Sequence, residues 1–163
     1  MTPSFARARI IALAAPAALL AGAYISEYGF GLWPCEMCWW QRYAHFAALV
    51  PAALAFVVPM GLLRIWFVRL AGLAILVSAG IGAFHAGVEY DWWEGLTSCS
   101  SALQAKEGQS ALDAIMAAPT VRCDDVQFSF LGISMAGWNF VISGLAGLLV
   151  LVFSARTAPG RVG

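Results

Sequence analysis

Four long stretches of this chain contain no charged residue. They cover residues 10–26, 43–63, 70–88 and 126–155. A helix needs about 20 apolar residues to cross the hydrocarbon core of a bilayer, and these stretches are close to that length or longer. Lipid admits only helices and closed barrels, and the lack of polar–apolar alternation excludes a barrel. The pattern therefore predicts four membrane-spanning helices.

The composition agrees with a membrane protein. Of the 163 residues, 61% are hydrophobic and only 11% are charged, whereas soluble proteins average about 25% charged residues. A chain this short has too small an interior to hide so much apolar surface from water. The formal net charge is zero, so nothing indicates a polyanionic partner such as nucleic acid.

We expect one all-α membrane domain over residues 1–163, built as a bundle of four transmembrane helices. The predicted spans lie at about residues 10–28, 41–60, 68–88 and 131–153, and the outer loops at about 29–40 and 89–130. An alternative for the first span is a cleaved signal peptide, because Arg7 and Arg9 precede an Ala-rich apolar run. Cleavage would leave three spans.

Charged residues separate by sign across the predicted spans. Six arginines share one side, which an excess of basic residues marks as cytoplasmic. They are Arg7, Arg9, Arg64, Arg69, Arg156 and Arg161. All nine acidic residues fall on the other side. Both termini are then cytoplasmic, and both outer loops face the opposite compartment.

The second outer loop contains one further helical signal. Residues 110–118 lie between Gly108 and Pro119 and carry apolar side chains on one helical face. The segment is too short to span a bilayer, so we expect a short amphipathic helix that lies flat on the membrane surface.

The chain has four cysteines, and the topology puts all of them on the outer side. They are Cys35, Cys38, Cys99 and Cys123. Disulfides persist in compartments outside the cytoplasm. One interpretation is that two ordinary disulfides staple the outer loops, and it stays open for the second pair. Another is a zinc site, although the chain has a single CxxC knuckle.

Cys35 and Cys38 favour redox chemistry over stabilisation. A disulfide across two intervening residues closes a very small loop and removes little entropy from the unfolded chain. Pro34 precedes the pair and a predicted span follows it, which places the pair in the first turn of a helix. The unpaired N–H groups and the positive dipole end at that position stabilise a thiolate.

Polar side chains follow the dithiol. Arg42 lies one turn after Cys38, where its charge would favour the thiolate and face an electron acceptor; the alternative is a snorkelling arginine. Gln41 would donate hydrogen bonds to the same acceptor or be an ordinary helix residue. His45 shares the stripe of Cys38 and Arg42, and His85 lies near the outer end of the third span. Each histidine would pass protons to the acceptor or be a hydrogen-bonded structural residue.

With these motifs the chain resembles the disulfide bond formation protein B (DsbB) family of bacterial inner-membrane quinone reductases. The resemblance covers nearly the whole chain. It rests on Pro34-Cys35-x-x-Cys38 followed by Gln41-Arg42, on the cysteine pair of the second loop, and on the stretches Phe84–Glu89, Trp92-Trp93 and Ser134–Asn139. The combination is specific, whereas a lone CxxC is not.

The resemblance implies an electron relay. A Cys99–Cys123 disulfide would accept electrons from a soluble, thioredoxin-like dithiol oxidase of the DsbA type, with Cys99 forming the mixed disulfide. Electrons would move to Cys35 and Cys38, and then from Cys38 to a membrane quinone, ubiquinone or menaquinone. The arginine four residues later would lie beside the quinone ring.

The resemblance also implies a location and a set of partners. The protein would be a multi-pass protein of the bacterial inner membrane with its cysteines on the periplasmic side. Its partners would be the DsbA-like oxidase and membrane lipid, and neither nucleic acid nor a metal is expected. Family members differ in the position of the histidine near the quinone, so His45 and His85 are both candidates, beside Gln41.

Two rival interpretations use the same cysteines differently. The vitamin K epoxide reductase family also combines a four-helix bundle with a CxxC and a quinone, but there the CxxC follows the loop pair, whereas here it comes first. A structural or adaptor membrane protein would use its disulfides only to staple loops. Such a protein would show no turnover.

Overall fold

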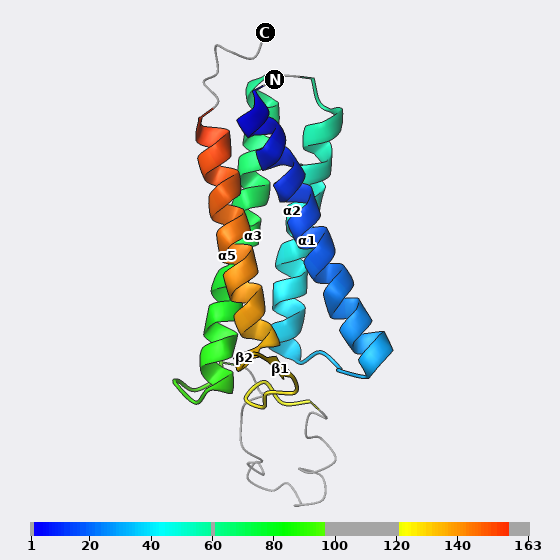
Figure 1. Cartoon of the computed structure of the whole chain (residues 1–163), viewed down its shortest axis with the longest axis vertical. Helices are drawn as coiled ribbons and strands as arrows, with labels where there is room; N and C mark the ends of the chain where they lie inside the picture. Colours follow the sequence, from blue (N-terminus) through cyan, green and yellow to red (C-terminus); the bar gives the residue numbers. More distant parts are fainter. Residues whose placement is uncertain (1, 60, 97–120, 157–163) are drawn as a thin grey trace, which may run out of the picture.

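The computed structural model describes residues 2–59, 61–96 and 121–156. Within these ranges the chain forms four long helices and a small hairpin (Figure 1). The helices are α1 (Pro3–Phe30), α2 (Glu36–Val57), α3 (Leu62–Glu89) and α5 (Met135–Ala155), and the strands are β1 (Ser129–Phe130) and β2 (Ile133–Ser134).

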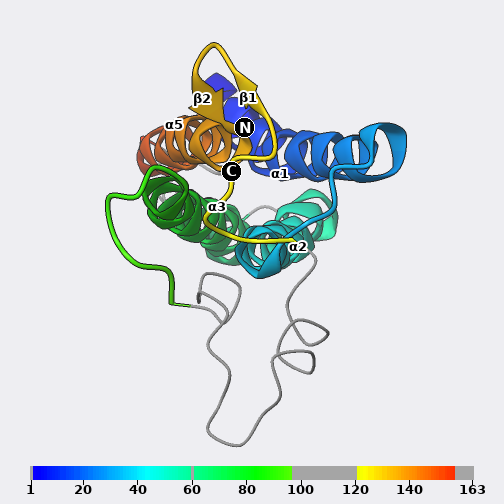
Figure 2. The same ribbon diagram turned by 90° about the horizontal axis from the view of Figure 1, so that it is seen from below.

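The helices form a bundle of two layers. Figure 2 shows α1 and α5 in one layer and α2 and α3 in the other. Helix α3 packs against α2 of its own layer and against α5 of the other layer. Helix α1 packs against α5 of its own layer and against α2 of the other layer. The start of α1 and the end of α5 lie at one end of the bundle, whereas the start of α2, the end of α3 and the hairpin lie at the other (Figure 1).

The predicted helical architecture of a membrane protein is confirmed in its coarse form. Three helices in the described part of the chain, α1, α3 and α5, are long and apolar enough to cross a membrane. Helix α2 has a similar length but carries polar side chains, including Gln41, Arg42 and His45. The predicted surface helix at residues 110–118 lies outside the described residues.

Local capping explains why the helices differ in length from the predicted spans. Helix α1 begins at Pro3 rather than near residue 10, because the side chain of Thr2 accepts a hydrogen bond from the backbone N–H of Phe5 (3.4 Å) and proline suits the first helical position. Helix α2 begins at Glu36 rather than near residue 41, because Cys35 caps it.

The start of α5 differs for a different reason. Residues 131–134, which the predicted fourth span includes, belong to the hairpin instead. Leu131 and Gly132 have φ of 53° and 78°, a left-handed conformation that turns the chain and that a helix does not adopt. The helix starts once the side chain of Ser134 accepts a hydrogen bond from the N–H of Gly137 (3.1 Å).

Glycines allow α3 and α5 to approach each other closely. A Cβ atom built on Gly147 of α5 would lie 2.7 Å from Cγ of Leu76 and 3.1 Å from the carbonyl oxygen of Gly72, both on α3. Small residues at such positions let helix backbones pack in lipid. The glycine therefore sets the separation of the two helices that carry much of the candidate site.

We expect Gly147→Ala to destabilise the bundle by about 1–3 kcal/mol, because overpacking forces neighbouring atoms apart. The measurement is the thermal unfolding midpoint in detergent. Gly80→Ala is the matched control, since a Cβ at Gly80 meets nothing within 4 Å and alanine favours a helix. Equal midpoints for the two variants would contradict the close packing.

Candidate active site

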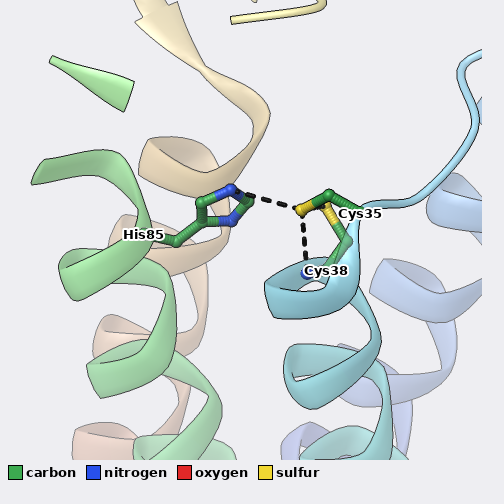
Figure 3. A group of neighbouring side chains, drawn as sticks. All are labelled: Cys35, Cys38 and His85. Carbon is green, nitrogen blue, oxygen red and sulfur yellow. Dashed lines mark hydrogen bonds between the residues drawn. The ribbon is translucent and has the colours of Figure 1, made fainter. Parts of the chain in front are cut away.

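Cys35 and Cys38 lie at the start of α2, as the sequence predicts. Cys35 is the N-cap residue, and its Sγ accepts a hydrogen bond from the backbone N–H of Cys38 (3.4 Å). The two Sγ atoms are 3.4 Å apart, so the residues form a hydrogen-bonded dithiol (Figure 3). Cys35 is buried, whereas Cys38 is partly exposed. The first helical turn thus supplies one of its unpaired N–H groups to the Cys35 sulfur.

His85 reaches the dithiol from α3. Its Nε2 lies 3.5 Å from Sγ of Cys35 (Figure 3), and its Nδ1 lies 2.9 Å from Nε2 of Gln41. An amide nitrogen donates, so Nδ1 accepts and the proton of the neutral imidazole is on Nε2. That proton points to the Cys35 sulfur. Glu89, one turn further along α3, has Oε1 3.7 Å from the same Nε2.

Gln41 connects the dithiol to a polar network inside the bundle. Its Oε1 accepts a hydrogen bond from Nδ2 of Asn139 on α5 (2.7 Å). Asn139 in turn accepts at Oδ1 from Nε2 of His45 (3.0 Å), and Ser78 of α3 lies 2.9 Å from that same nitrogen. These bonds fix the orientation of the Gln41 amide, which supports the assignment of the His85 proton.

Arg42 is buried and extends toward α1. Its Nη1 donates to Oε2 of Glu27 (2.5 Å), and both side chains are about 95% buried. Nη2 also donates to the carbonyl oxygen of Ala23 (3.3 Å). The guanidinium stacks over the rings of Tyr24 and Trp39, at 4.8 and 5.0 Å from their centroids. A buried charge needs such a partner, because desolvating it alone is costly.

Sequence reasoning missed Glu27 and Asn139. Glu27 reads as one of nine outer acids, yet it is buried and forms the ion pair with Arg42. The available signal was its place at the end of an apolar run, since a carboxylate at that depth needs a cation. Asn139 is the last residue of the stretch Ser134–Asn139, which carries part of the family resemblance. Its amide lies inside a predicted span, and such an amide is itself a signal for a hydrogen-bonded network.

Of the second cysteine pair, Cys99 and Cys123, only Cys123 lies within the described residues. It is buried and packs in one cluster with Cys35, Met37 and Val88. The contact joins the loop before β1 to the start of α2, although the two cysteines are far apart in the sequence. Cys99 lies outside the described residues.

Polar contacts hold this part of the loop over the dithiol. Gln127 donates from Nε2 to the carbonyl oxygen of Trp33 (3.0 Å), just before the start of α2. Arg122 forms an ion pair with Asp124 on either side of Cys123. Hydrogen bonding from the guanidinium holds the pKa of Asp124 below its ordinary value. The loop is therefore anchored next to the buried thiol.

One cavity of about 300 Å³ brings the helix residues together. Side chains of α1, α2, α3 and α5 line it. Its walls include all six predicted site residues of the helices: Cys35, Cys38, Gln41, Arg42, His45 and His85. His45 Nδ1 is buried and has no hydrogen-bond partner among the described residues. The volume is at the lower end of the range for small-molecule sites, which are mostly apolar with few polar groups.

The fold and the site together define a helical protein with three helices in its described part that are long and apolar enough to cross a membrane and a cysteine pair in the wall of a cavity. The family model of the disulfide bond formation protein DsbB matches residues 6–153. The chain belongs to this family, whose name implies a disulfide-forming oxidoreductase.

Curated relatives agree over nearly their whole length. The disulfide bond formation protein B of Marinobacter nauticus is 32% identical over 155 residues, which covers 89% of each chain. That of Verminephrobacter eiseniae is 33% identical over 158 residues, covering 93% of this chain and 86% of the relative. No solved structure matches this chain.

Proposed function

We propose that the protein reoxidises a DsbA-like thiol oxidase of the periplasm and passes the electrons to a membrane quinone, ubiquinone or menaquinone. In this proposal all four helices span the bacterial inner membrane, both termini are cytoplasmic and the dithiol faces the periplasmic side. The observation that carries the proposal is the position of the Cys35–Cys38 dithiol. It lies in the wall of the cavity and packs against Cys123.

The first steps are thiol–disulfide exchanges. A thiolate of the reduced partner attacks Cys99 of the Cys99–Cys123 disulfide, and Cys123 leaves as a thiolate. The second thiolate of the partner then attacks the mixed disulfide, so that the partner is oxidised and Cys99 is released. Each exchange moves two electrons and needs a deprotonated attacking sulfur.

Electrons then enter the helix pair. The Cys123 thiolate attacks Cys35 of the Cys35–Cys38 disulfide, and Cys38 leaves as a thiolate at the cavity wall. The Cys99 thiolate resolves the Cys35–Cys123 bond, which restores the loop disulfide and leaves Cys35 reduced. Cys123 and Cys35 lie in one cluster of buried residues, which supports this order. The Nε2–H of His85 points to the Cys35 sulfur and would stabilise its thiolate by a charge-assisted hydrogen bond.

The cavity residues fit a quinone. The quinone supplies the two-electron acceptor, and the protein supplies position and charge. The guanidinium of Arg42 is a fixed positive charge in the cavity wall. There it would stabilise negative charge that develops on an oxygen of the quinone ring. Glu27 positions Arg42 by their ion pair. His45 Nδ1 has no partner among the described residues and His45 lines the same cavity, so Nδ1 would accept a hydrogen bond from a hydroxyl group of the quinol product.

Redox energetics favours a quinone over a thiol acceptor. In bacterial systems of this family the DsbA couple is about −120 mV, whereas a glutathione-like couple is about −220 mV. Passing two electrons to the lower couple would be uphill by about 4.6 kcal/mol. A respiratory quinone is a stronger oxidant and is already dissolved in the bilayer.

The test of the proposal is turnover by the purified protein with reduced DsbA-type protein and ubiquinone, followed by quinone absorbance. We expect quinone reduction by the wild type and a loss of at least about a thousandfold in Cys99→Ser, since the loop disulfide that the partner attacks cannot form. Ser98→Ala is the neighbouring control and should keep the wild-type rate. Normal turnover by Cys99→Ser would refute the relay, and no turnover by the wild type would favour a structural protein.

A further inference from the structure

Three side chains at the start of α2 and the end of α3 form a set of metal ligands. The ligand atoms of Cys35, Cys38 and His85 all lie within 4.8 Å of one another (Figure 3). The two Sγ atoms are 3.4 Å apart, and Sγ of Cys35 is 3.5 Å from Nε2 of His85. Two thiolates and an imidazole are a zinc-type donor set.

The spacing matches a tetrahedral ion. Bonds of about 2.3 Å to sulfur and about 2.0 Å to nitrogen place two sulfurs about 3.8 Å apart and a sulfur and a nitrogen about 3.5 Å apart. The observed separations of 3.4 Å between sulfurs and 3.5 Å from the Cys35 sulfur to nitrogen are within a few tenths of an ångström of these values. The Cys38 sulfur and His85 Nε2 lie within 4.8 Å of each other, and rotation of the Cys38 side chain would close the remaining gap.

Glu89 lies next to His85, although its carboxylate is not part of the group of ligand atoms that all lie within 4.8 Å of one another. Its Oε1 is 3.7 Å from Nε2 of His85, and its Oε2 is buried without a hydrogen-bond partner among the described residues. Carboxylate oxygen is an accepted zinc ligand at about 2.0–2.2 Å. The buried carboxylate is an observation independent of the two cysteines, and a bound cation would offset the cost of burying its negative charge.

We propose that the reduced protein binds one zinc-type divalent cation through Cys35, Cys38 and His85, with the Glu89 carboxylate as an outer partner beside His85. Binding releases the two thiol protons and transfers no electrons. The proton of His85 moves from Nε2 to Nδ1, as metal-bound histidines usually require. The Gln41 amide then turns its carbonyl oxygen to Nδ1 and gives up the hydrogen bond that it accepts from Nδ2 of Asn139. All four residues line the cavity, which gives the ion a path to the site.

The site exists in one redox state only. A Cys35–Cys38 disulfide has no thiolate to offer, so oxidation releases the ion. A bound ion ties up both sulfurs and holds the protein out of turnover. This inhibition rests on the proposed quinone relay, whereas the binding itself does not.

Binding is tested with Co²⁺, whose thiolate charge-transfer and tetrahedral d–d absorption report the ligands directly. The protein is the full chain in detergent, in a Cys99→Ser/Cys123→Ser background so that only the helix pair is present as thiols. After reduction and removal of the reductant, we expect one Co²⁺ per chain, displaced by Zn²⁺. The disulfide form should give no such absorption.

Variants identify the ligands. We expect Cys38→Ser and His85→Ala each to weaken Co²⁺ binding by at least about 100-fold, because each removes a ligand. Glu89→Gln should weaken it by roughly 10-fold, since the loss of an outer partner typically costs about 10- to 100-fold in metal affinity. His45→Asn is the matched histidine control and should bind like the background, because its Nε2 contacts Asn139 and Ser78 instead. Circular dichroism checks that each variant remains helical.

Several outcomes would overturn the proposal. The first is that the reduced protein shows no tetrahedral Co²⁺ absorption. The second is that the disulfide form binds Co²⁺ equally well, and the third is that His85→Ala gives the same Co²⁺ spectrum as the background protein. None of these measurements uses quinone or the partner, so failure here is distinguishable from failure of the relay. Zn²⁺ should also inhibit wild-type quinone reduction, and full activity with Zn²⁺ bound would refute the inhibitory role.

Discussion

Cys38→Ser is expected to abolish quinone reduction, with a fall in turnover of at least about a thousandfold. The sulfur of Cys38 lies at the cavity wall and next to Cys35, so its loss removes the group that meets the acceptor. Without a Cys35–Cys38 disulfide, the electrons held by reduced loop cysteines have no acceptor. A Cys35 thiolate without its neighbour can attack Cys123, which packs against it, and release Cys99.

The same variant should therefore accumulate a Cys35–Cys123 disulfide. Peptide mapping under non-reducing conditions measures this bond, and quinone absorbance measures turnover in the same sample. Cys35→Ser is the matched variant: it should also lack turnover but cannot form the bond. Turnover at the wild-type rate by Cys38→Ser would contradict the account, as would a Cys38→Ser protein in which Cys35 pairs with no loop cysteine.

Arg42→Ala is expected to have the second largest effect, on both stability and quinone affinity. It leaves Glu27 as a buried charge without its partner, and breaking a buried pair in this way costs about 3–5 kcal/mol. It also removes a cation from the cavity wall. Hydrogen bonds to charged groups contribute about 1.5–3 kcal/mol, so the apparent quinone KM should rise at least about tenfold.

A second substitution separates the two effects. The double variant Arg42→Ala/Glu27→Gln removes both charges, so we expect its thermal midpoint to recover most of the loss in the single variant. Its quinone KM should stay as high as in Arg42→Ala. If the KM returned to the wild-type value together with the stability, Arg42 would be a structural residue whose only role is to pair with Glu27.

Much of the fold was predictable because lipid leaves few alternatives. Long uncharged runs in a chain this apolar can only be helices, and the helices appear where the runs are. Their ends were less predictable, because they depend on single capping side chains such as Thr2 and Cys35. The late start of α5 depends on the left-handed backbone of Leu131, which the sequence does not mark.

The site was predictable along one helix and not between helices. Helical spacing placed Cys35, Cys38 and Arg42 near one another. The partners Glu27 and Asn139 come from α1 and α5, and their contacts depend on how each helix is rotated about its axis. That rotation follows from side-chain packing across the whole bundle, which the spacing of residues in one span does not determine.

The most direct test of the central claim is a single turnover by the dithiol alone. The Cys99→Ser/Cys123→Ser protein, with Cys35 and Cys38 reduced, is mixed with one equivalent of ubiquinone and no partner, and quinone absorbance is followed by stopped flow. The account predicts reduction of one quinone per chain, together with formation of the Cys35–Cys38 disulfide. Unchanged quinone absorbance with both thiols still reduced would contradict it.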